Sequence, residues 1–142
     1  MRTVGEFLQD RKGPIQSIQP DHTVREALEL MAQHNIGALL VMEGPRLAGV
    51  FSERDYARKV ALLGRNSSDT QVRQIMSENV ISVSPKQTIE ECMELMTHHH
   101  IRHLPVLQDA QLLGLISIGD VVREMLAAQK FMIEQLHSYI SG

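Results

Sequence analysis

The sequence has no tryptophan, one cysteine, and only three phenylalanines and two tyrosines among 142 residues. Leucine, isoleucine, valine, methionine and alanine must therefore fill the core, and the eight methionines favour adaptable packing. A single cysteine excludes an intramolecular disulfide, and we interpret Cys92 as a small apolar residue on a helix face.

The chain also lacks long apolar runs and an excess of positive charge. Its longest apolar stretches, such as residues 36–42, are far too short to span a bilayer, and residues 1–6 contain no signal-peptide core. Lys and Arg total 14 against 17 Asp and Glu, and no basic stripe is visible, which argues against a nucleic-acid partner. We expect one compact cytoplasmic protein with neither a nucleic-acid nor a membrane partner.

An internal duplication organises the sequence. When residues 15–58 are placed on residues 80–123 without gaps, 16 of the 44 positions are identical. Chance would give about three identities over this length, so the two segments are repeats of one unit.

Each repeat has the same predicted order of elements, β-α-β-β-α. A short apolar strand (15–18; 80–83) leads to a capping box at Thr23 or Thr88, which begins a helix with one apolar face. Two strands follow (38–42 and 47–51; 103–107 and 112–116), joined by four residues, and a second helix begins after Ser52 or Ser117. One repeat is too small to be stable alone, so we expect two pseudo-symmetric repeats packed sheet to sheet in an α+β (α/β-like) fold.

The predicted domain is a single module over residues 1–142. Its parts are a first repeat at 5–63, a polar connection at 64–69, a second repeat at 70–125 and an extended C-terminal helix at 121–140. The end of this helix carries an apolar stripe that outruns the repeat: Met125, Met132, Ile133, Leu136 and Ile140. The stripe either packs on its own domain or mediates self-association, and the sequence leaves both open.

A Gly-x-x-Ser-x-x-Asp motif closes each repeat, at residues 49–55 and 114–120. One interpretation is a helix cap with an acidic first turn. The other is a nucleotide site, because a helix N-terminus attracts phosphate and a short carboxylate beside it accepts hydrogen bonds from ribose hydroxyls. Duplication of the motif in register favours the second interpretation.

Together with the segment Ile-Arg-His-Leu-Pro-Val at residues 101–106, this motif resembles a tandem pair of cystathionine-β-synthase (CBS) domains, also called a Bateman module. The resemblance covers residues 5–125. It implies two clefts between the repeats that accept AMP, ADP, ATP, NAD or S-adenosylmethionine. It also implies a homodimer that regulates an effector protein.

The resemblance assigns roles to individual residues. Asp55 and Asp120 match the ribose-binding aspartate, and Ser52 and Ser117 match the hydroxyl near the ribose or phosphate. The first strand of each repeat supplies the wall behind the adenine, at Ile15 and Gln16 and at Val80 and Ile81.

The two clefts are predicted to differ in charge. Arg102 and His103 match positions that often contact phosphate, whereas the first repeat has Gly37 and Ala38 there. The first repeat instead has Arg54, where the second has Gly119. Arg58 and Arg123 either reach the phosphates or pair with the aspartate three residues earlier on the helix.

We predict no metal site and no enzymatic activity. The side chains of His98, His99 and His100 point in different directions on a helix, and no nucleophile–base set is visible. The leading hypothesis is an adenine-nucleotide-binding regulatory module without a catalytic cofactor. The alternative is a structural dimerisation or adaptor protein with vestigial clefts.

Overall fold

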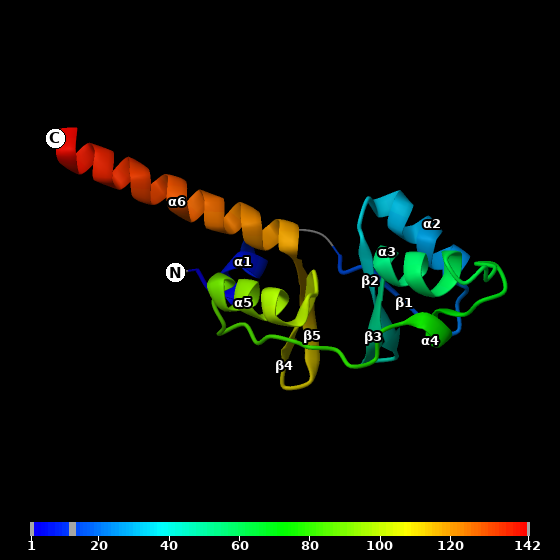
Figure 1. Ribbon diagram of the computed structural model, residues 1–142. Helices are drawn as coiled ribbons and strands as arrows, with labels where there is room; N and C mark the ends of the chain where they lie inside the picture. Colours follow the sequence, from blue (N-terminus) through cyan, green and yellow to red (C-terminus); the bar gives the residue numbers. More distant parts are fainter. Residues whose placement is uncertain (1, 12–13, 142) are drawn as a thin grey trace. The chain divides into compact units, whose positions relative to one another are not determined.

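The computed structural model describes residues 2–11 and 14–141 and shows a mixed helix-and-strand fold (Figure 1). The first repeat contains β1 (Ser17–Ile18), α2 (Val24–His34), β2 (Ala38–Glu43), β3 (Arg46–Ser52) and α3 (Glu53–Tyr56), which continues as the π-helix η1 (Ala57–Ala61). The second contains α5 (Ile89–His99), β4 (His103–Gln108), β5 (Gln111–Ser117) and α6 (Ile118–Ser141). Two short helices, α1 (Val4–Asp10) and α4 (Val72–Ile75), precede the aligned segments 15–58 and 80–123 of the two repeats. The predicted α+β class is confirmed.

The described chain divides into two compact units. The unit that we call the Asp55 unit holds residues 14–81 and 109–112, and the Asp120 unit holds residues 2–11, 82–108 and 113–141. Among the described residues, no helix is both long enough and apolar enough to cross a membrane.

The core of the Asp55 unit lies between α2 and a three-stranded sheet of order β1-β2-β3. Strand β1 runs parallel to β2, which pairs antiparallel with β3 so that Leu39 faces Phe51. Both side chains are fully buried and pack with Met31 of α2 and Ile75 of α4. Apart from Phe51, the buried side chains of this core are aliphatic or methionine, as the composition predicts.

The predicted capping boxes begin α2 and α5. The hydroxyl of Thr23 accepts a hydrogen bond from the backbone N–H of Glu26 at 3.1 Å, and that of Thr88 accepts one from Glu91 at 3.1 Å. Cys92 is buried in α5, as predicted, and burial raises the pKa of its thiol to about 11.

The second repeat departs from the prediction at residues 80–83. No extended strand forms there: Val83 makes one isolated parallel bridge with Val106, and β4 and β5 form a two-stranded sheet. Pro105 occupies the place that Leu40 holds in the first repeat, and it has no N–H with which to continue the ladder. The predicted second copy of the first strand is therefore wrong.

The two helices that precede the repeats cross over between them. In α1, the N–H groups of Val4 and Gly5 donate to the carbonyls of Gln87 and Pro85, in the second repeat. In α4, the N–H groups of Val72 and Arg73 donate to the carbonyls of His22 and Pro20, in the first. Each repeat is thus completed by the segment that precedes the other one, an exchange that the sequence analysis missed.

Candidate functional site

The second Ser-x-x-Asp motif forms the N-terminal cap of α6. The backbone N–H of Ser117 donates to Oδ2 of Asp120 at 2.8 Å, and the N–H of Asp120 donates to the hydroxyl of Ser117 at 3.1 Å. The N–H of Ile118 donates to the carbonyl of Arg102 at 2.8 Å. These bonds satisfy most of the backbone N–H groups in the first turn of α6. The motif therefore caps the helix, which is the first of the two roles that the sequence suggests for it.

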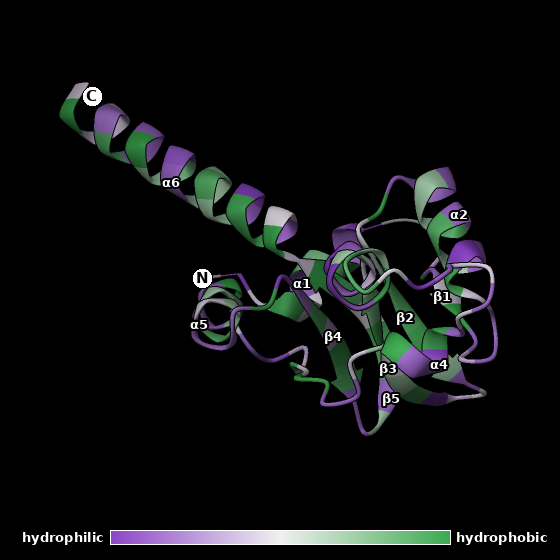
Figure 2. Ribbon diagram, turned by 45° about the vertical axis from the view of Figure 1, so that its right-hand side comes forward, coloured by the Kyte–Doolittle hydropathy of each residue, from purple (hydrophilic) through white to green (hydrophobic). Residues whose placement is uncertain are grey.

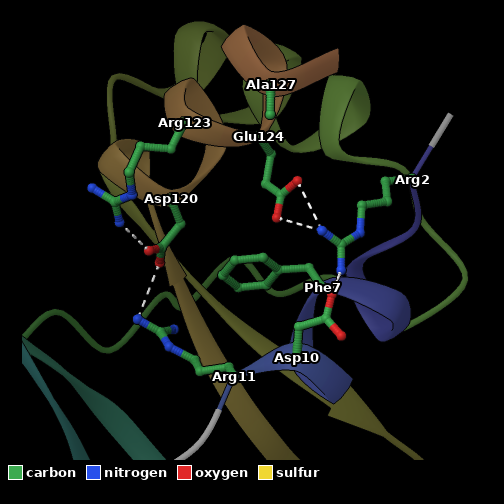
Figure 3. A pocket seen from close by; sticks show the side chains of 8 residues that line it. All are labelled: Arg2, Phe7, Asp10, Arg11, Asp120, Arg123, Glu124 and Ala127. Carbon is green, nitrogen blue, oxygen red and sulfur yellow. Dashed lines mark hydrogen bonds and ion pairs between the residues drawn. The ribbon is translucent and has the colours of Figure 1, made fainter. Parts of the chain in front are cut away.

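Two arginines surround the Asp120 carboxylate, which is only 4% exposed (Figure 3). Arg123 donates from Nη2 to Oδ1 at 2.6 Å, which is the i,i+3 pair considered from the sequence. Arg11, just after α1, places Nη2 3.4 Å from Oδ2 and donates from Nη1 to the carbonyl of Leu115 at 2.5 Å. Its guanidinium lies 5.5 Å from the centroid of the Phe7 ring. The buried carboxylate is therefore held by charge from both α1 and α6.

A pocket of about 530 Å³ opens beside this carboxylate (Figure 3). Arg2 crosses it and donates to Glu124 at 2.8 Å and to Asp10. The lining combines three guanidinium groups with three carboxylates, and comprises Arg2, Phe7, Asp10, Arg11, Asp120, Arg123, Glu124 and Ala127. Its volume lies within the usual range for small-molecule sites. Carboxylates can accept bonds from sugar hydroxyls, and arginines can bind phosphate oxygens through two donors at once.

His103 and Arg102 lie on the same unit as Asp120. Burial lowers the pKa of His103; the negative charge of Asp120 opposes this shift, and the positive charge of Arg102 adds to it. His103 is consequently a neutral imidazole at pH 7, able to donate one hydrogen bond and accept another. Arg102 is exposed.

The first motif has the same cap with different neighbours. Ser52 N–H donates to Oδ2 of Asp55 at 3.0 Å, and the N–H of Asp55 donates back to the Ser52 hydroxyl at 3.2 Å. The other carboxylate oxygen of Asp55 meets Lys59 Nζ at 3.4 Å and the Ser77 hydroxyl at 3.3 Å. Lys59 therefore pairs with Asp55, the pairing that the sequence suggested for Arg58. Arg58 and Arg54 are both exposed.

The remaining residues considered from the sequence fall on both units. Ile15 is 43% exposed and Gln16 is half-buried, both in the Asp55 unit. Val80 and Ile81, also half-buried, belong to that unit too. Gly119 is in the Asp120 unit, where an added Cβ would lie 3.4 Å from Nη1 of Arg123.

Arg2, Arg11, Lys59 and Ser77 were not found from the sequence. Arg11 and Ser77 were missed because they follow α1 and α4, and these segments lie outside the ungapped alignment of the repeats. One signal was available: a Thr-x-x-Glu capping box at Thr3 and Glu6, confirmed by a 3.2 Å bond, marks a helix before the first repeat.

Comparison with known proteins places this fold in a family. Residues 4–62 and 72–127 match the family model described as the CBS domain. The CBS domain-containing protein CBSX3, mitochondrial, of Arabidopsis thaliana is 43% identical over 127 residues, which cover 86% of this chain and 62% of that protein.

Solved structures agree with this match. A protein of Burkholderia ambifaria MC40-6 described as having CBS domains is 47% identical, with a TM-score of 0.86 over 89% of this chain and 96% of its own. The CBS domain pair of protein MJ0100, solved with 5′-methylthioadenosine and S-adenosyl-L-methionine, shares the fold at 22% identity, with a TM-score of 0.77 over 90% of this chain and 98% of its own. The chain belongs to the CBS domain family, with two repeats.

Proposed function

We propose that this protein is a regulatory module that binds an adenosine-containing ligand and does not catalyse a reaction. The observation that carries the proposal is the buried Asp120 carboxylate, which ends a duplicated Ser-x-x-Asp motif and lines a pocket rich in arginine. The ligand class comprises AMP, ADP, ATP, NAD and S-adenosylmethionine. The complex of the MJ0100 pair with two adenosine derivatives supports this class.

Ribose binding at Asp120 requires an exchange of partners. The Arg123 bond to Oδ1 is 2.6 Å long and lies within one helix, whereas Nη2 of Arg11 lies 3.4 Å from Oδ2 and comes from a segment far away in the sequence. We expect the ribose hydroxyls to displace Arg11 from Oδ2, since the longer of the two contacts is the weaker one. The released guanidinium is then available to phosphate.

Asp120 is the stronger of the two candidate sites. Its side chain is 4% exposed and contacts two arginines, while that of Asp55 is 13% exposed and contacts Lys59 and Ser77. A less exposed carboxylate gives stronger hydrogen bonds because water competes less. We therefore propose that the Asp120 site fills first, with Ser117, His103, Arg102 and Gly119 of the same unit around it. The second site would use Ser52, Asp55, Arg54 and Arg58, with Ile15 and Gln16.

We further propose that ligand binding changes the arrangement of a homodimer and that an effector protein responds to that change. A ligand can shift such an equilibrium only by its difference in affinity for the two arrangements. Cytoplasmic location is part of the same proposal, and the Arabidopsis relative is mitochondrial by its name. Cell fractionation tests the location.

Calorimetric titration with AMP, ATP, NAD and S-adenosylmethionine tests the ligand class. We expect at least one to bind, and Asp120→Asn to weaken that ligand about tenfold or more, because a hydrogen bond to a charged group contributes about 1.5–3 kcal/mol. Asp55→Asn, at the equivalent position of the other repeat, is the matched control and should weaken it less. No heat and no thermal stabilisation with any of the four at about 1 mM would overturn the proposal.

One observation favours a second candidate function, a structural adaptor with vestigial clefts. Both oxygens of Asp120 already have intramolecular partners, so the carboxylate could serve the cap of α6 alone. In that case Asp120→Asn would change stability but leave partner binding and every titration unaltered.

A further inference from the structure

A seven-residue repeat runs along the exposed part of α6. Three positions recur at this spacing: Val122, Gln129 and Leu136; Met125, Met132 and Tyr139; Leu126, Ile133 and Ile140. All lie on one face of a helix, since seven residues make two turns. A strict seven-residue spacing is the pattern by which one helix packs along another in a left-handed supercoil.

This face has no cover within the Asp120 unit. Exposed fractions of its apolar side chains run from 36% at Met125 to 86% at Tyr139. Both views show α6 continuing well past α1, α5 and the strands of its own unit (Figures 1 and 2). The CBS domain match ends at residue 127, so most of this segment is an addition to the family fold.

The pattern specifies what can cover the face. A seven-residue repeat over 19 residues needs a helical partner of similar length with the same repeat. Within the described residues, α6 has 24 residues and the next longest helices, α2 and α5, have 11 each and are occupied by their own cores. The helix that fits is therefore α6 of a second copy of this chain.

The area of the face is sufficient for such an interface. If each copy covers about half of the surface that these eight apolar side chains expose, about 500 Å² per copy and about 1,000 Å² per pair are buried. This area reaches the lower limit for a specific protein–protein contact. The charged residues Lys130 and Glu134 lie off the repeat, where they stay in water, and Gln129 is the one polar residue within it. A single polar residue in such a seam fixes the register of the two helices.

We infer that two copies of this chain associate through the face of α6 formed by residues 122, 125, 126, 129, 132, 133, 136, 139 and 140. This inference rests on the homodimer in the proposed function and assigns its interface. The contact is helix to helix and apolar, and it joins the Asp120 units of the two copies.

Sedimentation velocity on the full-length chain tests this interface, with one variant on the face and one off it. Leu136→Glu places a charge within the repeat. Phe131→Glu makes the same kind of change at a side chain that is 63% exposed and lies outside the repeat, so it controls for general stickiness. Both residues are exposed in the single chain, so neither variant should alter its folding, which circular dichroism verifies.

We expect wild type and Phe131→Glu to sediment as the same oligomer, and Leu136→Glu to sediment at half that mass or to need at least tenfold more protein to assemble. The proposed interface would be overturned if the Leu136→Glu variant remained an oligomer, or if Phe131→Glu dissociated the oligomer as well. Either result would leave the homodimer itself unchallenged. A wild-type chain that remains at the 16.0 kDa monomer mass at about 100 μM would contradict both the interface and the homodimer, because this concentration is well above the dissociation constants of specific complexes. The face would then belong to another protein or to a lipid surface.

Discussion

Replacing Gly114 by alanine should destabilise the protein far less than the equivalent change at Gly49. A Cβ at Gly114 would lie 2.9 Å from Cδ2 of Leu8, the mobile end of a side chain on α1. A Cβ at Gly49 would lie 2.7 Å from the backbone oxygen of Ser77, which cannot rotate away. The two glycines are equivalent in the duplication, so each is the other's control.

The two costs follow from what must move. At Gly114, overpacking costs about 1–3 kcal/mol, and the loss of glycine flexibility in the unfolded chain returns about 0.5–1 kcal/mol, which leaves about 1 kcal/mol. At Gly49 the segment at Ser77 must withdraw, which breaks its two hydrogen bonds with Val50 at 3.1 and 2.9 Å. With about 1 kcal/mol for each bond added to the overpacking, we expect about 3 kcal/mol or more.

Urea unfolding followed by circular dichroism measures both costs. In a Leu8→Ala background the Gly114→Ala cost should vanish, because the clashing atom has been removed, whereas the Gly49→Ala cost should be unchanged. Equal costs at the two glycines, or a Gly114→Ala cost that persists without the Leu8 side chain, would refute the packing of α1 on β5.

Three other outcomes follow from the structure. Ala110→Gly in the β4–β5 turn should stabilise the protein by about 0.5–1 kcal/mol in urea unfolding, because Ala110 has φ +65°, a strained value for a residue with a Cβ; a loss of stability would contradict this geometry. His103 has its pKa lowered by burial, so the unfolded chain binds protons more readily, and stability should fall as pH drops below 6.5. His103→Gln should flatten that part of the pH profile, and an unchanged slope would exclude His103 as its cause. Cys92, whose thiol pKa is raised to about 11, should resist a thiol reagent at pH 8 in the native state and react fully in urea; rapid native labelling would show that α5 is not packed as described.

Local patterns in the sequence were sufficient to predict most of the fold. Duplication at a constant spacing located both repeats, and the Thr-x-x-Glu boxes marked the start of α2 and α5 because a cap depends on residues three apart. The predicted hairpins were also found, although each turn has two residues rather than four, Gly44-Pro45 and Asp109-Ala110. The positive φ values of Gly44, Asp109 and Ala110 permit this tight reversal.

What the sequence could not supply are contacts between segments that lie far apart in it. Arg11 reaches Asp120 only because α1 crosses to the second repeat, and no local pattern encodes that exchange. The strand expected at residues 80–83 does not form because its partner strand contains Pro105, and the apolar residues at 80–83 carry no information about that partner. Lys59 rather than Arg58 pairs with Asp55 because α3 continues as a π-helix, which changes the spacing of side chains along it.

The central claim, that Asp120 binds the ribose of an adenosine ligand, is tested most directly by comparing a ribose ligand with its 2′-deoxy analogue by calorimetric titration. If the carboxylate accepts the 2′-hydroxyl, the analogue should bind wild type about 10–100-fold more weakly, as expected for the loss of a charge-assisted hydrogen bond, and this difference should shrink strongly in Asp120→Asn. Equal affinities of the two ligands for the wild-type protein would contradict the claim.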